Sequence, residues 1–196
     1  MGRIRSSLRH NLSRLSDFSG RDSRELFWPW AIILFLVEQA VSLMLTMVPL
    51  YRVFTQGLPA LAEASRSPAP EAATDAAMQQ MMATIFASLG ALWIPSVILH
   101  LVIVALLAAA VVRRLHDVGR TGWWGLLPLP FLAGSLAATP VVMNMFMSGR
   151  PPTGAEMLVF LPGCLLWIVV IALVVLLAKP GQEGPNRFGA ASRPAS

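Results

Sequence analysis

The sequence predicts an all-α integral membrane protein, built as a bundle of four transmembrane helices with both chain ends in the cytoplasm. Composition is the first reason: of 196 residues, 56% are hydrophobic and 13% charged, and the mean hydropathy is +0.65. A soluble domain of this size cannot bury so much apolar surface. The second reason is that four apolar stretches reach the roughly 20 residues that a helix needs to cross a bilayer.

A basic arm, residues 1–16, precedes the first apolar stretch. Its leucine and isoleucine residues recur at intervals of four, four and three positions, with arginines between them: Ile4, Leu8, Leu12 and Leu15. This pattern is typical of a short amphipathic helix on the inner leaflet, with its arginines near anionic head groups. A disordered basic tail is the equally supported alternative.

The four predicted spans cover residues 28–50, 85–112, 123–147 and 157–178, and the last three contain no Asp, Glu, Lys or Arg. The first contains Glu38, yet its apolar core is much longer than the roughly 7–15 residues of a signal peptide, so an uncleaved anchor is predicted. Prolines in the third span predict a bent helix. Because neighbouring helices must satisfy the carbonyls that such a bend frees, this span is expected inside the bundle.

Residues 51–84 are predicted to form the longer of two outer connections. Pro59, Pro68 and Pro70, together with many alanines, predict an extended and weakly structured connector with a helix that restarts near Asp75. The membrane domain as a whole is expected to cover residues 17–190. Residues 191–196 are expected to be a frayed tail.

The positions of the basic residues predict the orientation. Residues 1–27, 113–122 and 179–196 contain 12 of the 15 lysines and arginines. Both termini and the 113–122 connection are therefore predicted to face the cytoplasm. The net charge of +5 then matches a membrane surface. Nucleic acid is not an expected partner, because no stretch is long enough to form a folded basic domain that reads bases.

Three polar motifs border this predicted cytoplasmic face. They read Phe-Ser-Gly-Arg from residue 18, Arg-Arg-Leu-His-Asp from residue 113 with Gly-Trp-Trp from residue 122, and Gly-Pro-Asn-Arg-Phe-Gly from residue 184. Over about residues 17–190 the chain resembles the bacterial inner-membrane family called domain of unknown function 805 (DUF805). Thr121 and Phe188 stand where that family typically has serine and tyrosine. The resemblance implies a multi-pass protein of the bacterial inner membrane and supplies no activity.

The three motifs are predicted to meet as a polar cytoplasmic rim, since each borders the same membrane surface. Their charges are complementary, which suits a structural clasp made of arginine–carboxylate pairs. A site for a lipid head group or small anion, made by surplus arginines, is the alternative. The candidate rim residues are Phe18, Gly20, Arg21, Arg24, Glu25, Arg113, Arg114, His116, Asp117, Gly122, Trp123, Trp124, Gly184, Pro185, Asn186 and Arg187.

Catalytic, metal and cofactor sites are not predicted. His116 and Asp117 are adjacent, but neighbouring residues on a helix point about 100° apart. Neither of the other two motifs contains a histidine or cysteine that could complete a metal site. Apart from Met1, the methionines lie toward the predicted outer side, where their thioethers could bind Cu(I). Flexible apolar filling is the better-supported interpretation of these methionines.

Two ionisable residues lie inside the predicted spans. Glu38 is ten residues past Trp28, and His100 is twelve residues before Val112. At 1.5 Å per residue these positions are about 15 and 18 Å from the same face. The matching depths permit a hydrogen bond between neighbouring helices, which would serve either helix packing or a proton or ion path.

Two functions follow from these features. The first is a non-enzymatic membrane module that binds lipids, expected to be anionic, or a protein partner or second copy of the chain, at its cytoplasmic rim. The alternative is a small transporter or channel subunit with a proton- or ion-coupled site at Glu38 and His100.

Overall fold

The computed structural model describes residues 2–148 and 153–190, so the predicted frayed tail lies outside the described residues. Within these ranges the α-helices are α1 (Gly2–Ser13), α2 (Arg24–Arg52), α3 (Leu58–Ala64), α4 (Pro70–Asp117), α5 (Leu129–Met147) and α6 (Leu161–Ala178). A π-helical turn, η1 (Val53–Gly57), joins α2 to α3, and the 3-10 turns η2 (Gly122–Leu126) and η3 (Glu156–Phe160) lead into α5 and α6. Four helical segments are long and apolar enough to span a membrane. The predicted all-α class and its four apolar helices are confirmed.

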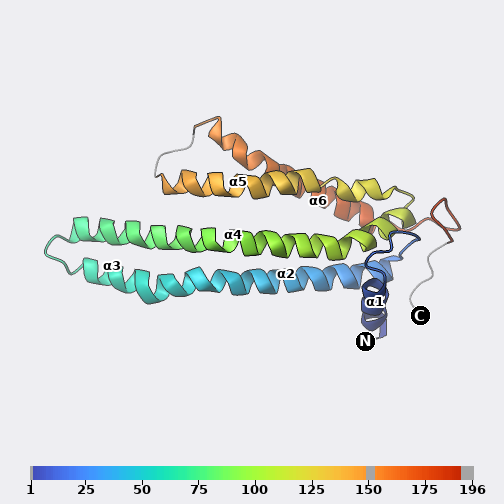
Figure 1. Ribbon diagram of the computed structural model, residues 1–196, viewed down its shortest axis with the longest axis horizontal. Helices are drawn as coiled ribbons and strands as arrows, with labels where there is room; N and C mark the ends of the chain where they lie inside the picture. The colour runs from blue at the N-terminus through green and yellow to red at the C-terminus, as the bar shows by residue number, and fades with distance from the viewer. Residues whose placement is uncertain (1, 149–152, 191–196) are drawn as a thin grey trace.

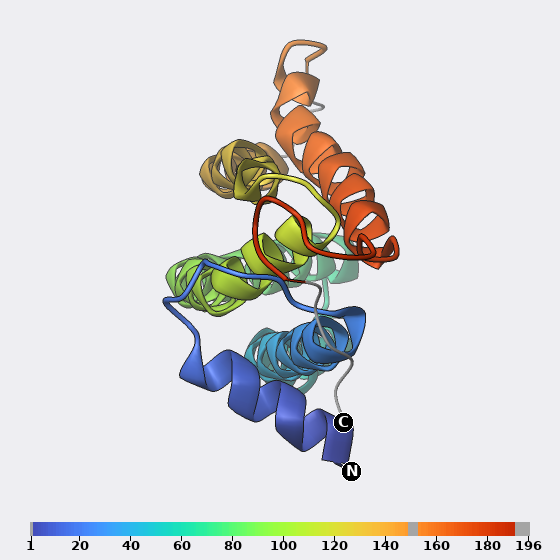
Figure 2. The ribbon, with the colours of Figure 1, turned by 90° about the vertical axis from the view of Figure 1, so that its right-hand side faces the viewer.

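The helices form layers on either side of α4. Figure 1 shows α2 and α4 as a long antiparallel hairpin, with α5 and α6 on the far side of α4. The view along the hairpin in Figure 2 gives the order α1, α2, α4, and then α5 with α6. α1 runs across the end of α2, roughly perpendicular to it (Figure 1). We call this end, where α1 meets the C-terminus of α4, the clasp end, and the opposite end, where α3 connects to α4, the hairpin end.

The connection over residues 51–84 is helical, unlike the extended segment that we expected. α2 continues through η1 into α3, and α4 begins at Pro70. Pro59 and Pro70 both occupy the first turn of a helix. A proline fits there because the amide it lacks would have no partner inside the helix anyway. The prolines therefore start helices in this segment, and the hairpin extends beyond the predicted spans.

α5 lies at the outside of the bundle, and the expectation that the third span is packed inside is wrong. None of its residues is buried, and it packs chiefly against α6. The prolines do interrupt the helical segment, because η2 ends at Leu126 and α5 begins at Leu129. The interruption comes before α5, next to the end of α4. Inside α5, Pro140 frees the carbonyl of Leu136, and the indole nitrogen of Trp93 in α4 donates to that carbonyl at 3.3 Å.

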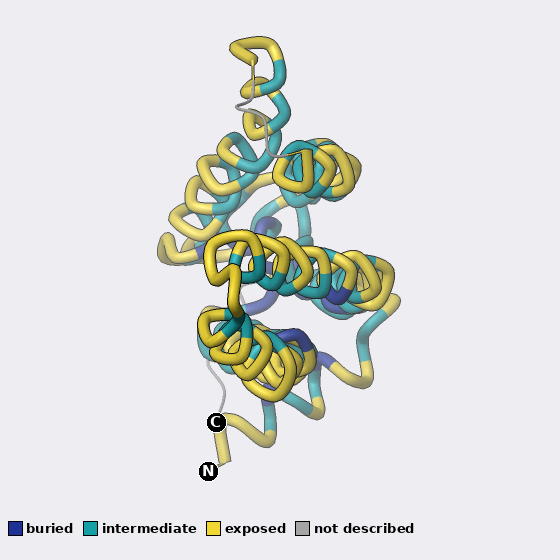
Figure 3. Tube along the Cα trace, turned by 90° about the vertical axis from the view of Figure 1, so that its left-hand side faces the viewer, coloured by how far each residue is buried: buried dark blue, intermediate teal, exposed yellow. Residues whose placement is uncertain are grey.

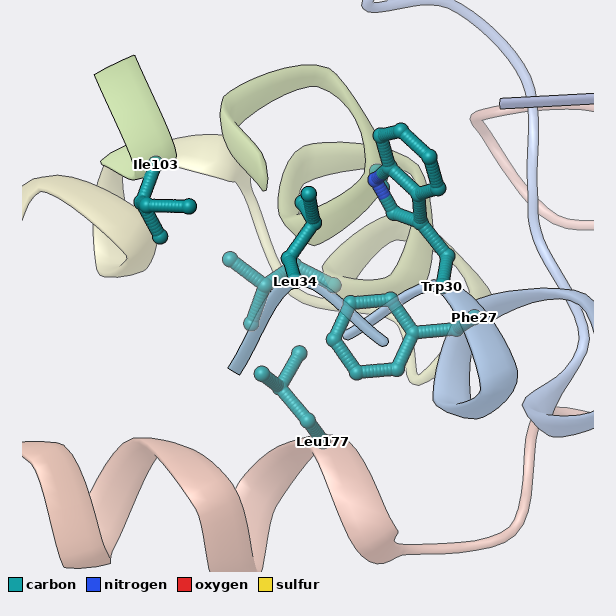
Figure 4. Packing of buried hydrophobic residues seen from close by; sticks show 7 residues of the cluster. Phe27, Trp30, Leu34, Ile103 and Leu177 are labelled. Carbon is teal, nitrogen blue, oxygen red and sulfur yellow. The ribbon is translucent and has the colours of Figure 1, made fainter. Parts of the chain in front are cut away.

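The buried apolar core is concentrated near the clasp end. Phe27, Trp30 and Leu34 of α2 pack there with Ile103 of α4 and Leu177 of α6 (Figure 4). The indole nitrogen of Trp30 also donates to the carbonyl of Leu106, at 3.2 Å. Most of the remaining helical surface is exposed or half-buried (Figure 3), as expected for helices whose apolar side chains face lipid. The polar motifs thus stand on the best-packed part of the molecule.

Candidate functional site: a buried arginine clasp

All three polar motifs converge at the clasp end, where they bury five charged side chains. We call these residues the clasp: Arg21, Asp22, Arg113, Arg114 and Asp117. Their relative exposure is 0% for Arg113, Arg114 and Asp22, 1% for Asp117 and 8% for Arg21. Charges can be buried to this degree only when they are paired and hydrogen-bonded. The geometry of the clasp supplies those partners.

Arg113 uses all of its guanidinium nitrogens within the protein. Nε donates to Oδ2 of Asp22 at 2.7 Å, and Nη2 donates to the side-chain oxygen of Asn11 at 2.9 Å. Nη1 donates to the carbonyls of Arg14 and Asp17, at 2.9 and 2.5 Å. Arg113 therefore joins α4 to the segment between α1 and α2.

Arg114 ties α4 to the end of α6. Its Nε donates to the carbonyl of Leu177 at 2.9 Å, and its Nη2 donates to the carbonyl of Lys179. Its Nη1 pairs with Oδ2 of Asp117, one helical turn further along. These carbonyls belong to the last turn of α6 and to its C-cap, where the helix provides no amide donors for them. Arg114 thus acts as a C-cap supplied by a neighbouring helix.

Arg21 joins the first motif to the other two. Its Nε donates to Oδ1 of Asp117 at 3.1 Å, so Asp117 receives one arginine on each oxygen. Its Nη1 and Nη2 donate to the carbonyls of Gly184 and Gln182, at 2.7 and 2.5 Å. The tail approaches this carboxylate so closely that a Cβ on Gly181 would overlap it. A glycine at this position is therefore a requirement of the clasp.

His116 and Asp117 point to different partners, as their adjacency on a helix predicts. His116 lies on the tail: its ring stacks on Phe188 at 4.0 Å, and its Nδ1 is 3.1 Å from the carbonyl of Gly20. Asn186 donates to the His116 carbonyl at 3.0 Å. Phe188 contributes a ring face to this contact. Among the described residues, no three His, Cys, Asp or Glu side chains are grouped to hold a metal ion.

Several predicted rim residues surround the clasp and take no part in it. Phe18, Arg24, Trp123, Trp124 and Pro185 are exposed. One carboxylate oxygen of Glu25 is buried and has no hydrogen-bond partner among the described residues, so within them Glu25 is not paired through that oxygen as the charge pattern suggested. Arg187 lies over the Phe188 ring, 4.7 Å from its centre. The rim therefore consists of a buried clasp and an exposed basic and aromatic border.

α1 packs against the protein through polar side chains, a role that its apolar pattern did not predict. Ser7 and Asn11 are buried, and both donate to the carbonyl of Leu26 in α2, at 2.5 and 3.1 Å. His10 Nε2 contacts Oδ1 of Asp22 at 2.8 Å. A signal was present, since Ser7 and Asn11 are four residues apart and share one face of a helix. This polar stripe predicts that α1 packs against the protein, whereas the apolar pattern alone predicts that it packs against lipid.

A compact turn links α1 to the first motif. Asp17 accepts hydrogen bonds from the amide and the hydroxyl of Ser19, at 2.9 and 2.5 Å, and pairs with Arg14 at 2.7 Å. The Ser19 donors, followed by Arg14, hold the pKa of Asp17 far below its ordinary value. Asp17 therefore stays ionised and keeps the turn closed. The same turn presents the two carbonyls that Arg113 binds.

Glu38 of α2 and His100 of α4 meet, as their matched depths allowed. Oε1 of Glu38 is 3.3 Å from Nε2 of His100, and Nδ1 of His100 is 2.7 Å from the carbonyl of Ser96. A carbonyl only accepts, so Nδ1 carries a hydrogen. The two side chains thus form a polar contact between α2 and α4 at a depth where the spans are otherwise apolar.

Comparison with known proteins gives one family match. The family described as protein of unknown function (DUF805) matches residues 15–190, a range that includes all three motifs and the four long helical segments. The match begins after α1. No curated protein and no solved structure matches the chain.

Proposed function

The chain belongs to the DUF805 family, which supplies a class of protein but no reaction, and on that premise we propose that it is a non-enzymatic module of the bacterial inner membrane. In this proposal the clasp fixes the cytoplasmic ends of the helices. The exposed border around it binds anionic lipid head groups or, in the second form of the proposal, a partner protein.

The main support for this proposal is that the clasp arginines already have a hydrogen-bond partner for each side-chain nitrogen. Every guanidinium nitrogen of Arg113 and of Arg114 donates to a group of the same chain. Neither arginine is therefore free to hold a ligand, and both serve architecture. Asp22 and Asp117 are ion-paired with arginines, which leaves neither of them suited to act as a general base.

The ligand-binding part of the proposal is supported by exposed arginines that do not belong to the clasp. Arg24, Arg120 and Arg187 are exposed around it, and so are Arg5 and Arg9 on α1. Each such residue near an anionic leaflet contributes about 1 kcal/mol of attraction. Arg120 also lies over the ring of Trp124, at 5.7 Å, which is an arrangement suited to a membrane interface.

Native mass spectrometry of the full chain in neutral detergent tests the proposal, with phosphatidylglycerol as the anionic probe and phosphatidylcholine as the neutral one. The triple variant Arg24→Gln, Arg120→Gln, Arg187→Gln is expected to retain at least tenfold less phosphatidylglycerol at equal lipid concentration. Arg66→Gln, an exposed arginine at the hairpin end, is the control. Equal retention by the triple variant and the wild type would contradict the lipid proposal.

A proton-coupled membrane function is the second candidate, and the 3.3 Å contact between Glu38 and His100 favours it. Ionisable side chains paired inside a membrane are often part of a proton or ion path. The wild type reconstituted in liposomes should then carry a proton flux that Glu38→Gln abolishes at unchanged expression. A wild type without flux, or a variant with full flux, would eliminate this candidate.

A further inference from the structure

The hairpin end contains a small polar cavity where α2 passes into η1 opposite the beginning of α4. Its volume is about 60 Å³. The polar lining comes from both arms of the hairpin, and small residues form much of the remainder. The lining residues are Arg52, Val53, Gln56, Gly57, Ala60, Ala77, Gln80, Met81 and Thr84. None of them is acidic, so the cavity has a net positive charge.

A buried serine holds Arg52 beside this cavity. Nη1 of Arg52 donates to the hydroxyl oxygen of Ser88 at 3.1 Å, and that hydroxyl donates to the carbonyl of Thr84 at 2.8 Å. Ser88 is only 4% exposed. Within the described residues, Arg52 makes no other hydrogen bond or ion pair, so Nε and Nη2 remain available as donors. The contact through Nη1 thus orients the guanidinium, and its other two nitrogens can donate to a ligand.

The backbone on one side of the cavity is irregular. η1 is a π-helical turn, and such turns inside α-helices often occur at functional sites. A Cβ at Gly57 would lie 2.8 Å from Cγ of Met81, so η1 and α4 pack closely here. The side-chain amides of Gln56 and Gln80 make no hydrogen bond within the described residues, and both are exposed.

We propose that this cavity binds one phosphate group. A guanidinium and two uncommitted amides line the cavity and are donors of the kind that oxyanions require, and arginine recognises phosphate by paired hydrogen bonds. The volume, about that of two waters in the liquid, suits a small group better than a whole nucleotide or sugar. This site is independent of the proposed rim and of the clasp.

The position of Arg52 connects this chemistry to the membrane. Arg52 is 24 residues past Trp28, and Ser88 is 24 residues before Val112. At 1.5 Å per residue both lie about 36 Å from the opposite face. This distance is just beyond a hydrocarbon core of about 30 Å, at the level of the head groups. A lipid phosphodiester and free phosphate are both ligands of the required chemistry.

Binding of inorganic phosphate and of phosphatidylglycerol to the full chain tests the proposal and separates the two sources. Phosphate affinity is measured from the thermal midpoint in neutral detergent at constant ionic strength, with chloride as the reference. Phosphatidylglycerol retention is measured by native mass spectrometry. Arg52→Gln is expected to weaken binding of at least one probe about tenfold, and Arg66→Gln, which makes the same charge change outside the cavity, to leave both unchanged.

Arg52-dependent binding of phosphatidylglycerol alone or of both probes identifies a head-group site, and binding of phosphate alone identifies a free-oxyanion site. If neither probe depends on Arg52, or if Arg66→Gln weakens binding equally, the proposal is overturned. Gln80→Ala provides a second variant if Arg52→Gln does not fold. It removes one donor and leaves the Arg52–Ser88 contact intact, and a several-fold loss of the same probe is expected.

Discussion

At the residue scale, the pairing inside the clasp depends on which way each side chain leaves its helix. Complementary charges in the three motifs were sufficient to predict that arginines and carboxylates would pair. They did not assign the partners: Arg113 selects Asp22 and Asn11, whereas Arg187 stacks on Phe188. Partner choice is set by helix rotation and by the path of the tail, and neither is encoded in the spacing of charges along the chain.

The pairing of Arg113 with Asp22 gives the first prediction. Arg113→Met leaves a buried carboxylate without its cation and is expected to destabilise the fold by about 3–5 kcal/mol, as is Asp22→Leu. The double variant is expected to cost clearly less than the sum, because neither charge is then left alone. Unfolding in mixed detergent micelles, followed by tryptophan fluorescence, measures these free energies.

Arg120→Met is the matched control for this cycle. It removes the same guanidinium from an exposed site close to the clasp in sequence, and its effect should stay within about 0.5 kcal/mol. Strictly additive effects of Arg113→Met and Asp22→Leu would show that the two residues are not coupled. The clasp would then be a set of separate contacts.

At the element scale, α1 lies outside the residues that the family matches. The family match begins at residue 15, and α1 ends at Ser13, yet α1 places Asn11 and His10 directly on the clasp. Its docking uses the polar stripe of Ser7 and Asn11. The exposed Ile4 and Leu12, at 50% and 56%, are left available to a membrane surface.

Asn11→Leu gives the prediction for this element. The substitution keeps the approximate volume but removes hydrogen bonds to Arg113 and to the carbonyl of Leu26, so a loss of about 1–3 kcal/mol is expected. α1 should also detach more readily, which trypsin cleavage at Arg5 and Arg9 would detect. Ser13→Leu, on the exposed side of α1, serves as the control. Unchanged cleavage in Asn11→Leu would show that α1 is held by its apolar contacts.

The elements themselves were predictable to different degrees. The four apolar helices follow from the length and hydropathy of their sequences, and the structure has them where expected. The helical hairpin end does not follow, because an alanine-rich segment with prolines is compatible with both a helix start and an extended chain. The cavity at Arg52 was missed for the same reason. It exists only because residues 51–84 are helical and antiparallel.

At the scale of the whole molecule, the two ends have different construction. α4 has 48 residues, and α5 and α6 have 19 and 18. At 1.5 Å per residue α4 is about 72 Å long, more than twice the roughly 30 Å hydrocarbon core. Since the clasp aligns the C-termini of α4 and α6, the excess length extends from the hairpin end (Figure 1). The clasp end is compact and basic, and the hairpin end protrudes.

The orientation of these two ends is the last prediction, and it decides which leaflet each proposed site faces. In a Cys164→Ser background, Ser65→Cys marks the hairpin end and Ser16→Cys marks the clasp end; both serines are exposed. The distribution of arginines places the clasp end inside, so a membrane-impermeant maleimide should label Ser65→Cys in intact spheroplasts. It should label Ser16→Cys only after permeabilisation. The reverse pattern would place the basic border outside, away from the anionic cytoplasmic surface. The lipid-binding proposal would then lose its electrostatic basis, and the clasp would keep only its structural role.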